Sequence, residues 1–101
     1  MENNITQTLE ERMAALGERP VLLLRRIDGE RVFRYGVGMA VHPPTRYSIY
    51  AEYRAGELHT ITRIPAFSSD RDTAESFCSL LERVLATPLS LEAIYEDSLT
   101  P

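Results

Sequence analysis

The sequence predicts an α+β fold: a four-stranded antiparallel meander with a long and a short C-terminal helix, plus an N-terminal helix. Between residues 20 and 66, short apolar or alternating runs are separated by turn residues, which is typical of strands. After Phe67 the apolar residues recur at helical spacing. The connections between the runs are short, which favours antiparallel neighbours. We therefore expect an N-terminal helix or flexible segment over residues 1–19 and a single α+β domain over residues 20–101.

The N-terminal segment is polar and acidic, and its apolar stripe is narrow. The stripe consists of Ile5, Leu9, Met13 and Leu16. Asn3 or Asn4 is a suitable N-cap for such a helix, and Gly17 is a suitable end. Because the stripe is narrow, three arrangements stay open: the helix docks on the domain, pairs with another chain, or frays.

Four strands are expected, over residues 21–27, 31–42, 47–54 and 58–64. The first two are joined by Asp28-Gly29-Glu30, a strong signal for a tight hairpin. Pro65 ends the fourth strand, because proline cannot donate a ladder hydrogen bond. The side chains of the second strand that share one face by period two are Phe33, Tyr35, Val37, Met39 and Val41.

The long C-terminal helix is expected to start at Ser69, its N-cap, with Asp72 three residues later. It ends before Thr87-Pro88, and Ser90 can cap a second, shorter helix. The apolar face of the long helix comprises Ala74, Phe77, Leu81 and Val84. An antiparallel sheet needs at least one covered face, and this stripe can supply the cover.

Gly36 and Gly38 form a glycine pair that resembles a phosphate-binding loop only superficially. A dinucleotide fingerprint needs a third small residue at the position of Val41, and a Walker loop needs a lysine, which the chain lacks. Alternation continues through both glycines, so they lie in a strand and leave a bare strip on its even-numbered face. The strip can accept Tyr50 from the neighbouring strand, a helix, or a partner molecule.

The chemistry-bearing residues form no recognisable catalytic constellation. His42 and His59 are the two histidines and have no evident third metal ligand. Cys78 is the only cysteine, so no intramolecular disulfide forms, and its position flanking the helix stripe indicates a small buried hydrophobe. A Cys78–histidine pair stays open. We predict no catalytic residue, no metal site and no cofactor.

The N-terminus has no secretory signal pattern, and the longest aliphatic run, Val21–Leu24, is too short to span a bilayer. A cytoplasmic protein without membrane association is therefore expected. The net charge of −4 argues against binding to nucleic acid.

The charge is unevenly distributed along the chain. From Arg19 to Ala66 eight arginines accompany four acidic residues, whereas both flanking segments are acidic. In one interpretation the acidic helices lie beside the basic sheet and the charges screen one another. In the other, an uncovered sheet face presents arginine and tyrosine to an acidic partner. The candidate partner-binding residues are Arg34, Gly36, Gly38, Tyr50 and Arg54.

Three segments resemble a family of small uncharacterised bacterial proteins, a domain of unknown function. They are YGVGM in the second strand, SSDRDTAESF at the start of the long helix, and the closing PLSLEAIYEDSL. The resemblance covers residues 35–99 and leaves out the first twenty residues. It implies a compact domain of the bacterial cytoplasm and brings no activity or functional residue with it.

These observations together favour a small non-enzymatic interaction or regulatory module that binds a protein partner or associates with itself. The alternative is a small-molecule-binding domain or minor enzyme with a pocket between sheet and helix. In that alternative His42, His59 or Cys78 lies at the pocket wall.

Overall fold

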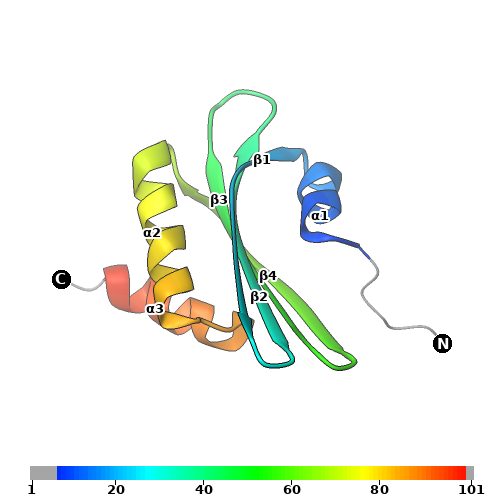
Figure 1. Cartoon of the computed structure of the whole chain (residues 1–101). Coiled ribbons are helices and arrows are strands. Elements are labelled where there is room, and N and C mark those ends of the chain that lie inside the picture. The colour runs from blue at the N-terminus through cyan, green and yellow to red at the C-terminus, as the bar shows by residue number, and fades with distance from the viewer. Residues whose placement is uncertain (1–6, 100–101) are drawn as a thin grey trace.

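The order of helices and strands along the chain is the predicted one, in a computed structural model that describes residues 7–99 (Figure 1). The elements are α1 (Leu9–Ala15), β1 (Glu18–Asp28), β2 (Arg31–Ala40), β3 (Tyr47–Ala55), β4 (Leu58–Ser68), α2 (Arg71–Val84) and α3 (Pro88–Leu99). The sheet has the order β1-β2-β3-β4 with every neighbouring pair antiparallel. The predicted α+β meander is therefore confirmed.

Helices cover both faces of the sheet. Helices α2 and α3 lie on one face, and α1 lies on the other (Figure 1). The odd-numbered side chains of β2 point to α2, where Phe33, Tyr35 and Val37 are buried, as their alternation predicts. The remaining buried residues of this core are Tyr47, Ile49, Ala51, Ile64, Ala74, Phe77, Cys78, Leu81, Ala86 and Leu91.

Helix α1 begins at Leu9 and has Thr8 as its N-cap. The Thr8 hydroxyl accepts a hydrogen bond from the amide of Glu11 at 3.0 Å, and the Glu11 carboxylate accepts one from the amide of Thr8 at 2.9 Å. This reciprocal pair is a capping box, which satisfies two otherwise unpaired amides. The predicted caps Asn3 and Asn4 lie outside the described residues.

The stripe of α1 docks on the sheet, which selects one of the three arrangements left open by the sequence. Leu9 and Met13 are fully buried against Tyr50. Gly17 follows the helix with a φ of +77°, a left-handed conformation that glycine adopts at no steric cost. Leu16, at the C-terminal end of the stripe, is 45% exposed, and Ile5 lies outside the described residues.

Both outer strands are longer than predicted, and β2 is shorter. Strand β4 continues through Pro65 to Ser68, so the prediction that Pro65 ends it is wrong. It lies at the edge of the sheet, where the missing N–H of proline costs no ladder bond. Strand β1 likewise contains Pro20. Strand β2 ends at Ala40, two residues before the predicted end.

Both C-terminal helices start at other caps than predicted. Asp70, rather than Ser69, caps α2, because its carboxylate accepts from the amide of Thr73 at 2.9 Å. Thr87 precedes α3 and exchanges hydrogen bonds with Ser90, whose amide lies 3.3 Å from the Thr87 hydroxyl. Ser90 is therefore inside the helix that it was expected to cap. A carboxylate accepts an amide hydrogen bond more strongly than a hydroxyl does, which favours Asp70.

Candidate functional site

The bare strip at Gly36 and Gly38 is filled by the protein itself. A Cβ atom on Gly36 would lie 2.8 Å from Cε of Met13, at the underside of α1. A Cβ atom on Gly38 would lie 3.0 Å from both Oε1 of Glu18 and Cε1 of Tyr50. Helix α1 and Tyr50 of the neighbouring strand therefore occupy the strip. They are two of the three occupants that the sequence left open.

Beneath α1, a buried polar cluster joins three strands around the carboxylate of Glu18. The Tyr50 hydroxyl donates to Oε1 of Glu18, and the Ser48 hydroxyl donates to Oε2 at 2.6 Å. The guanidinium of Arg63 donates to Oε2 at 2.9 Å. Burial and the Glu18 carboxylate raise the pKa of Tyr50 well above its ordinary value. Tyr50 therefore stays neutral and serves as a structural donor at physiological pH.

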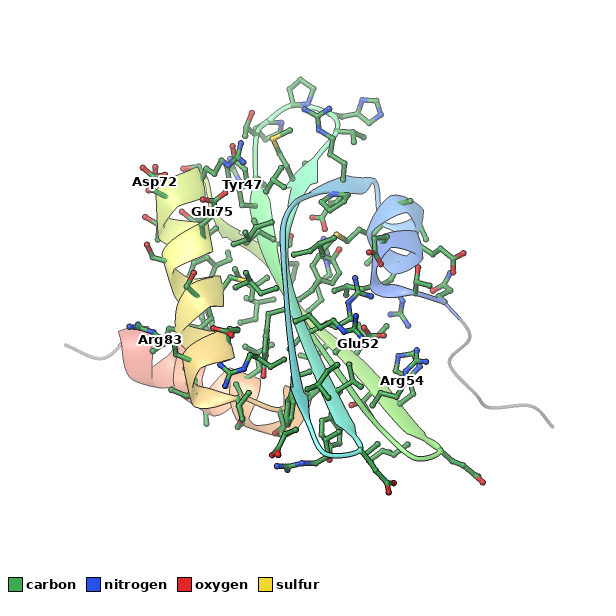
Figure 2. All side chains as sticks on the ribbon, viewed as in Figure 1. Tyr47, Glu52, Arg54, Asp72, Glu75 and Arg83 are labelled. Carbon is green, nitrogen blue, oxygen red and sulfur yellow. The ribbon has the colours of Figure 1, made fainter. Side chains whose placement is uncertain are left out.

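A groove opens on the same sheet face, beyond the end of α1. We call it the arginine groove, and it has a volume of about 390 Å³. Its lining residues are Thr8, Arg25, Val32, Arg34, Glu52 and Arg54. Figure 2 shows Glu52 and Arg54 on the side of the sheet that carries α1. The strand register places Arg25, Arg34 and Glu52 side by side across three strands.

Two of the three arginines in the groove already have acidic partners. Arg34 donates to Oε2 of Glu10 on α1 at 2.6 Å and lies 3.4 Å from the buried carboxylate of Glu52. The hydrogen bond from Arg34 lowers the pKa of Glu10. Arg54 lies 3.7 Å from the Glu52 carboxylate. Arg25 is exposed and forms no ion pair with any residue of the described range 7–99.

The charge-screening interpretation holds for part of the basic sheet. Glu10 of α1 binds Arg34, and Glu82 of α2 binds Arg26 at 3.0 Å, so each flanking acidic helix neutralises one strand arginine. The arginine groove nevertheless contains three guanidinium groups and only two nearby carboxylates, those of Glu10 and Glu52. It therefore retains an excess of positive charge.

The structure separates the five residues that the sequence suggested for partner binding. Arg34 and Arg54 line the arginine groove. Gly36, Gly38 and Tyr50 are buried under α1, which corrects the expectation that this sheet face is uncovered. This face is covered because α1 packs on the sheet through Leu9 and Met13. The narrow apolar stripe of α1 did not by itself predict that the helix would dock there.

Arg25 was not among the partner-binding residues predicted from the sequence, although the register of the hairpin places it beside them. Counting outward from the Asp28–Arg31 turn places Arg25 directly opposite Arg34. The same count places Leu23 and Ile27 opposite Gly36 and Val32, and the register shift between Pro20 and Leu22 then brings the even-numbered Glu18 and Pro20 opposite Ala40 and Gly38. Alternation read within each strand separately cannot reveal such a neighbour.

The residues with catalytic chemistry are dispersed. Cys78 is fully buried, and burial raises the pKa of its thiol to about 12. His59 lies on the α1 face, where Nε2 is 2.6 Å from Oε2 of Glu52, so the sheet separates it from Cys78. A Cys78–His59 pair is therefore excluded. Within the described range, no three histidine, cysteine or acidic residues are grouped to hold a metal.

A second, more apolar groove of about 540 Å³ lies between the end of β4 and helices α2 and α3. The rings of Phe67 and Phe77 stack at 4.8 Å, and Tyr95 is tilted against Phe67 at 5.7 Å. Arg83 lies at the rim. This aromatic groove combines a flat apolar floor with one cation.

Comparisons of the chain with protein-family models, curated proteins and solved structures found no significant match. Over residues 7–99, no helix combines the length and apolarity needed to cross a membrane.

Proposed function

We propose that this protein is a small non-enzymatic interaction module that binds an acidic segment of a protein partner in the arginine groove. The observation that carries the proposal is the convergence of Arg25, Arg34 and Arg54 on one groove. Arginine is enriched among the residues that anchor protein interfaces, and its planar guanidinium pairs well with carboxylates.

The chain itself provides an example of the proposed contact. Glu10 enters beside the groove and binds Arg34 at 2.6 Å, so a carboxylate is accommodated there in good hydrogen-bond geometry. Arg25 and Arg54 are more exposed than Arg34, and they can donate hydrogen bonds to further carboxylates without displacing Glu10. Ile27 and Val32 lie opposite each other at the margin and offer apolar contact. A segment with alternating acidic and apolar residues fits this surface.

Binding of a fluorescent peptide of alternating glutamate and leucine, followed by anisotropy, tests the proposal. Arg25→Glu and Arg54→Glu are each expected to weaken binding about tenfold or more. Arg46→Glu is the matched control, because Arg46 is exposed in the loop between β2 and β3 and carries the same charge change. Binding should also weaken with salt. Equal losses in all three variants would show only a net-charge effect and would overturn the proposal.

A second candidate function rests on the aromatic groove, namely binding of a small aromatic carboxylate. Its aromatic ring would pack onto Phe67 and Tyr95, whose rings contact each other, and its carboxylate would pair with Arg83. A thermal-shift screen of aromatic acids, with Arg83→Ala as the test variant, decides between the two functions. The absence of any Arg83-dependent shift would remove this candidate. A regulatory role, bacterial origin and cytoplasmic location remain predictions of the sequence.

A further inference from the structure

Strand β1 is an edge of the sheet, and it carries the longest aliphatic run of the chain. No strand lies beyond it within the described range of residues 7–99. Its side chains Leu23 and Ile27 are 38% and 59% exposed. An edge of this kind presents unpaired backbone groups and apolar side chains, which together favour pairing with another strand.

The two edges of the sheet differ in how well they are protected. Strand β4 contains Pro65, a positive φ at Ala66, and a shift in its register with β3, all of which oppose strand addition. Strand β1 has comparable interruptions only at its start, at Pro20 and the following register shift. From Leu22 to Asp28 its pairing with β2 is regular. The unprotected edge is therefore this part of β1.

We propose that two copies of this chain pair through β1, antiparallel about a two-fold axis at Leu24, and so form one continuous sheet. This surface is the edge of the sheet beside the arginine groove, and Arg25 borders both. In such a pair, residues equally distant from the axis lie opposite each other and share a face. Leu23 then lies opposite Arg25 of the second copy, and Leu22 lies opposite Arg26 of the second copy.

The position of the axis follows from charge and from the register shift. An axis at Arg25 would place two arginines directly opposite each other, which is destabilising. An axis at Leu23 would pair Arg25 with the irregular backbone at Val21. An axis at Leu24 places no arginine opposite another and moves the irregular backbone at Val21 outward, opposite Ile27. Arg25 and Arg26 then each face a leucine, against which the aliphatic stem can pack.

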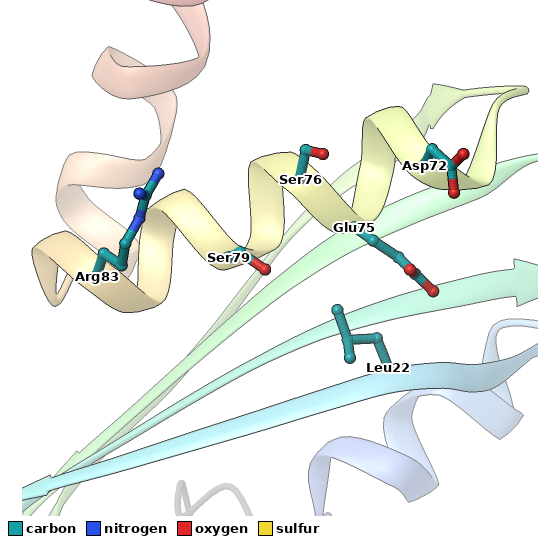
Figure 3. Close-up of a pocket in the computed structure, with 6 residues that line it drawn as sticks. All are labelled: Leu22, Asp72, Glu75, Ser76, Ser79 and Arg83. Atoms are coloured by element: carbon teal, nitrogen blue, oxygen red, sulfur yellow. The ribbon is translucent and has the colours of Figure 1, made fainter.

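Charge complementarity supports a second copy as the occupant of this edge. Figure 3 shows Leu22 facing Glu75 across a groove of about 550 Å³ between β1 and α2, with Asp72 at one end. In the proposed register Arg26 of the second copy lies opposite Leu22, on the side of these two carboxylates. Glu75 already binds Arg71 of its own chain at 2.7 Å, so Asp72 is the carboxylate left for the second copy's Arg26. The Arg26 side chain is 48% exposed, so it is available for this contact in addition to its bond to Glu82.

The pairing leaves room for helix α2 of each copy. Helix α2 packs mainly over β2 and β3. The β2 strands of the two copies would lie three strand spacings apart, about 14 Å. Packed helices need 8–10 Å, so the two α2 helices do not collide, and long side chains can bridge the space. Both arginine grooves would lie on the same face of the joined sheet, which allows bivalent binding of a partner.

Sedimentation velocity from low micromolar to near-millimolar concentration tests the proposal with the full chain. Leu23→Glu is expected to lower the dissociation constant of the dimer roughly threefold to tenfold, and Leu23→Arg is expected to raise it by a similar factor. The effect is counted twice, because the two-fold axis places residue 23 of each copy opposite Arg25 of the other. Leu58, which is 54% exposed on β4, provides the matched control pair Leu58→Glu and Leu58→Arg. These two variants should leave the dimer unchanged.

Oxidative cross-linking tests the position of the axis. Leu24→Cys should form a disulfide-linked dimer, because residues on the axis lie within disulfide distance. Leu22→Cys should not, because its two copies would be about 14 Å apart. Cys78 can stay in place, since it is buried.

Several outcomes would overturn the proposal. They are a monomer at every concentration, equal effects of the two Leu23 variants, or equal cross-linking at Leu22 and Leu24. A monomer whose β1 instead binds an extended peptide would assign this edge to a different partner, which also contradicts self-pairing.

Discussion

Gly38→Ala tests whether the glycine strip is required by the buried cluster around Glu18. The added Cβ would lie 3.0 Å from both Oε1 of Glu18 and Cε1 of Tyr50, closer than ordinary van der Waals contact. Neither neighbour can withdraw freely. Tyr50 is fully buried, and the Glu18 carboxylate is held by Tyr50, Ser48 and Arg63.

The expected cost combines two opposing contributions. Overpacking a buried site costs about 1–3 kcal/mol when the neighbours are fixed. Replacing a strand glycine by alanine recovers about 0.5–1 kcal/mol of backbone entropy. The middle of each range gives a net loss of unfolding free energy of about 1 kcal/mol, which corresponds to a fall in melting temperature of about 5–10 °C for a domain of this size.

Gly36→Ala is the matched comparison. Its new Cβ would lie 2.8 Å from Cε of Met13 and 3.1 Å from Cδ2 of Leu23, and both atoms are at the ends of flexible side chains. These side chains can rotate away, so the backbone gain offsets most of the cost. Urea unfolding of both variants measures the difference. If Gly38→Ala is as stable as the parent chain, or more stable than Gly36→Ala, the reasoning about the Glu18 cluster is refuted.

Three further predictions follow from burial. Met13→Ala should lower the free energy of unfolding by about 2–5 kcal/mol in urea titrations, because Met13 is fully buried under α1; a loss below about 1 kcal/mol would mean that α1 unfolds separately. Cys78 should not react with a thiol reagent in the native protein and should react after unfolding, because burial raises its pKa to about 12; rapid native labelling would contradict its buried position. Burial raises the pKa values of Tyr35 and Tyr50 above the ordinary 10.0. Their contribution to stability is therefore complete below pH 10 and is lost as the pH rises further, and phenolate absorbance should show two tyrosines that ionise only on alkaline unfolding.

The sequence alone determined the meander and the face to which β2 directs its apolar side chains. These features depend on local rules: period two along a strand, the positive φ that Asp-Gly tolerates, and the change to helical spacing after Phe67. The confirmed burial of Phe33, Tyr35 and Val37 follows from that alternation. The secondary-structure predictions that failed concern the ends of elements, as at Pro65, where an edge position removed the cost of proline.

Tertiary structure decided what covers the other sheet face and which charges meet there. Met13 of α1 and Tyr50 of β3 cover the strip at Gly36 and Gly38. Arg25 of β1 lies opposite Arg34 of β2. Such contacts depend on strand register and on the docking of a helix whose stripe is too narrow to show its target. The sequence pattern records which side of its own element a residue faces. It does not record which residue of another element lies opposite, because that depends on the summed packing of the whole domain.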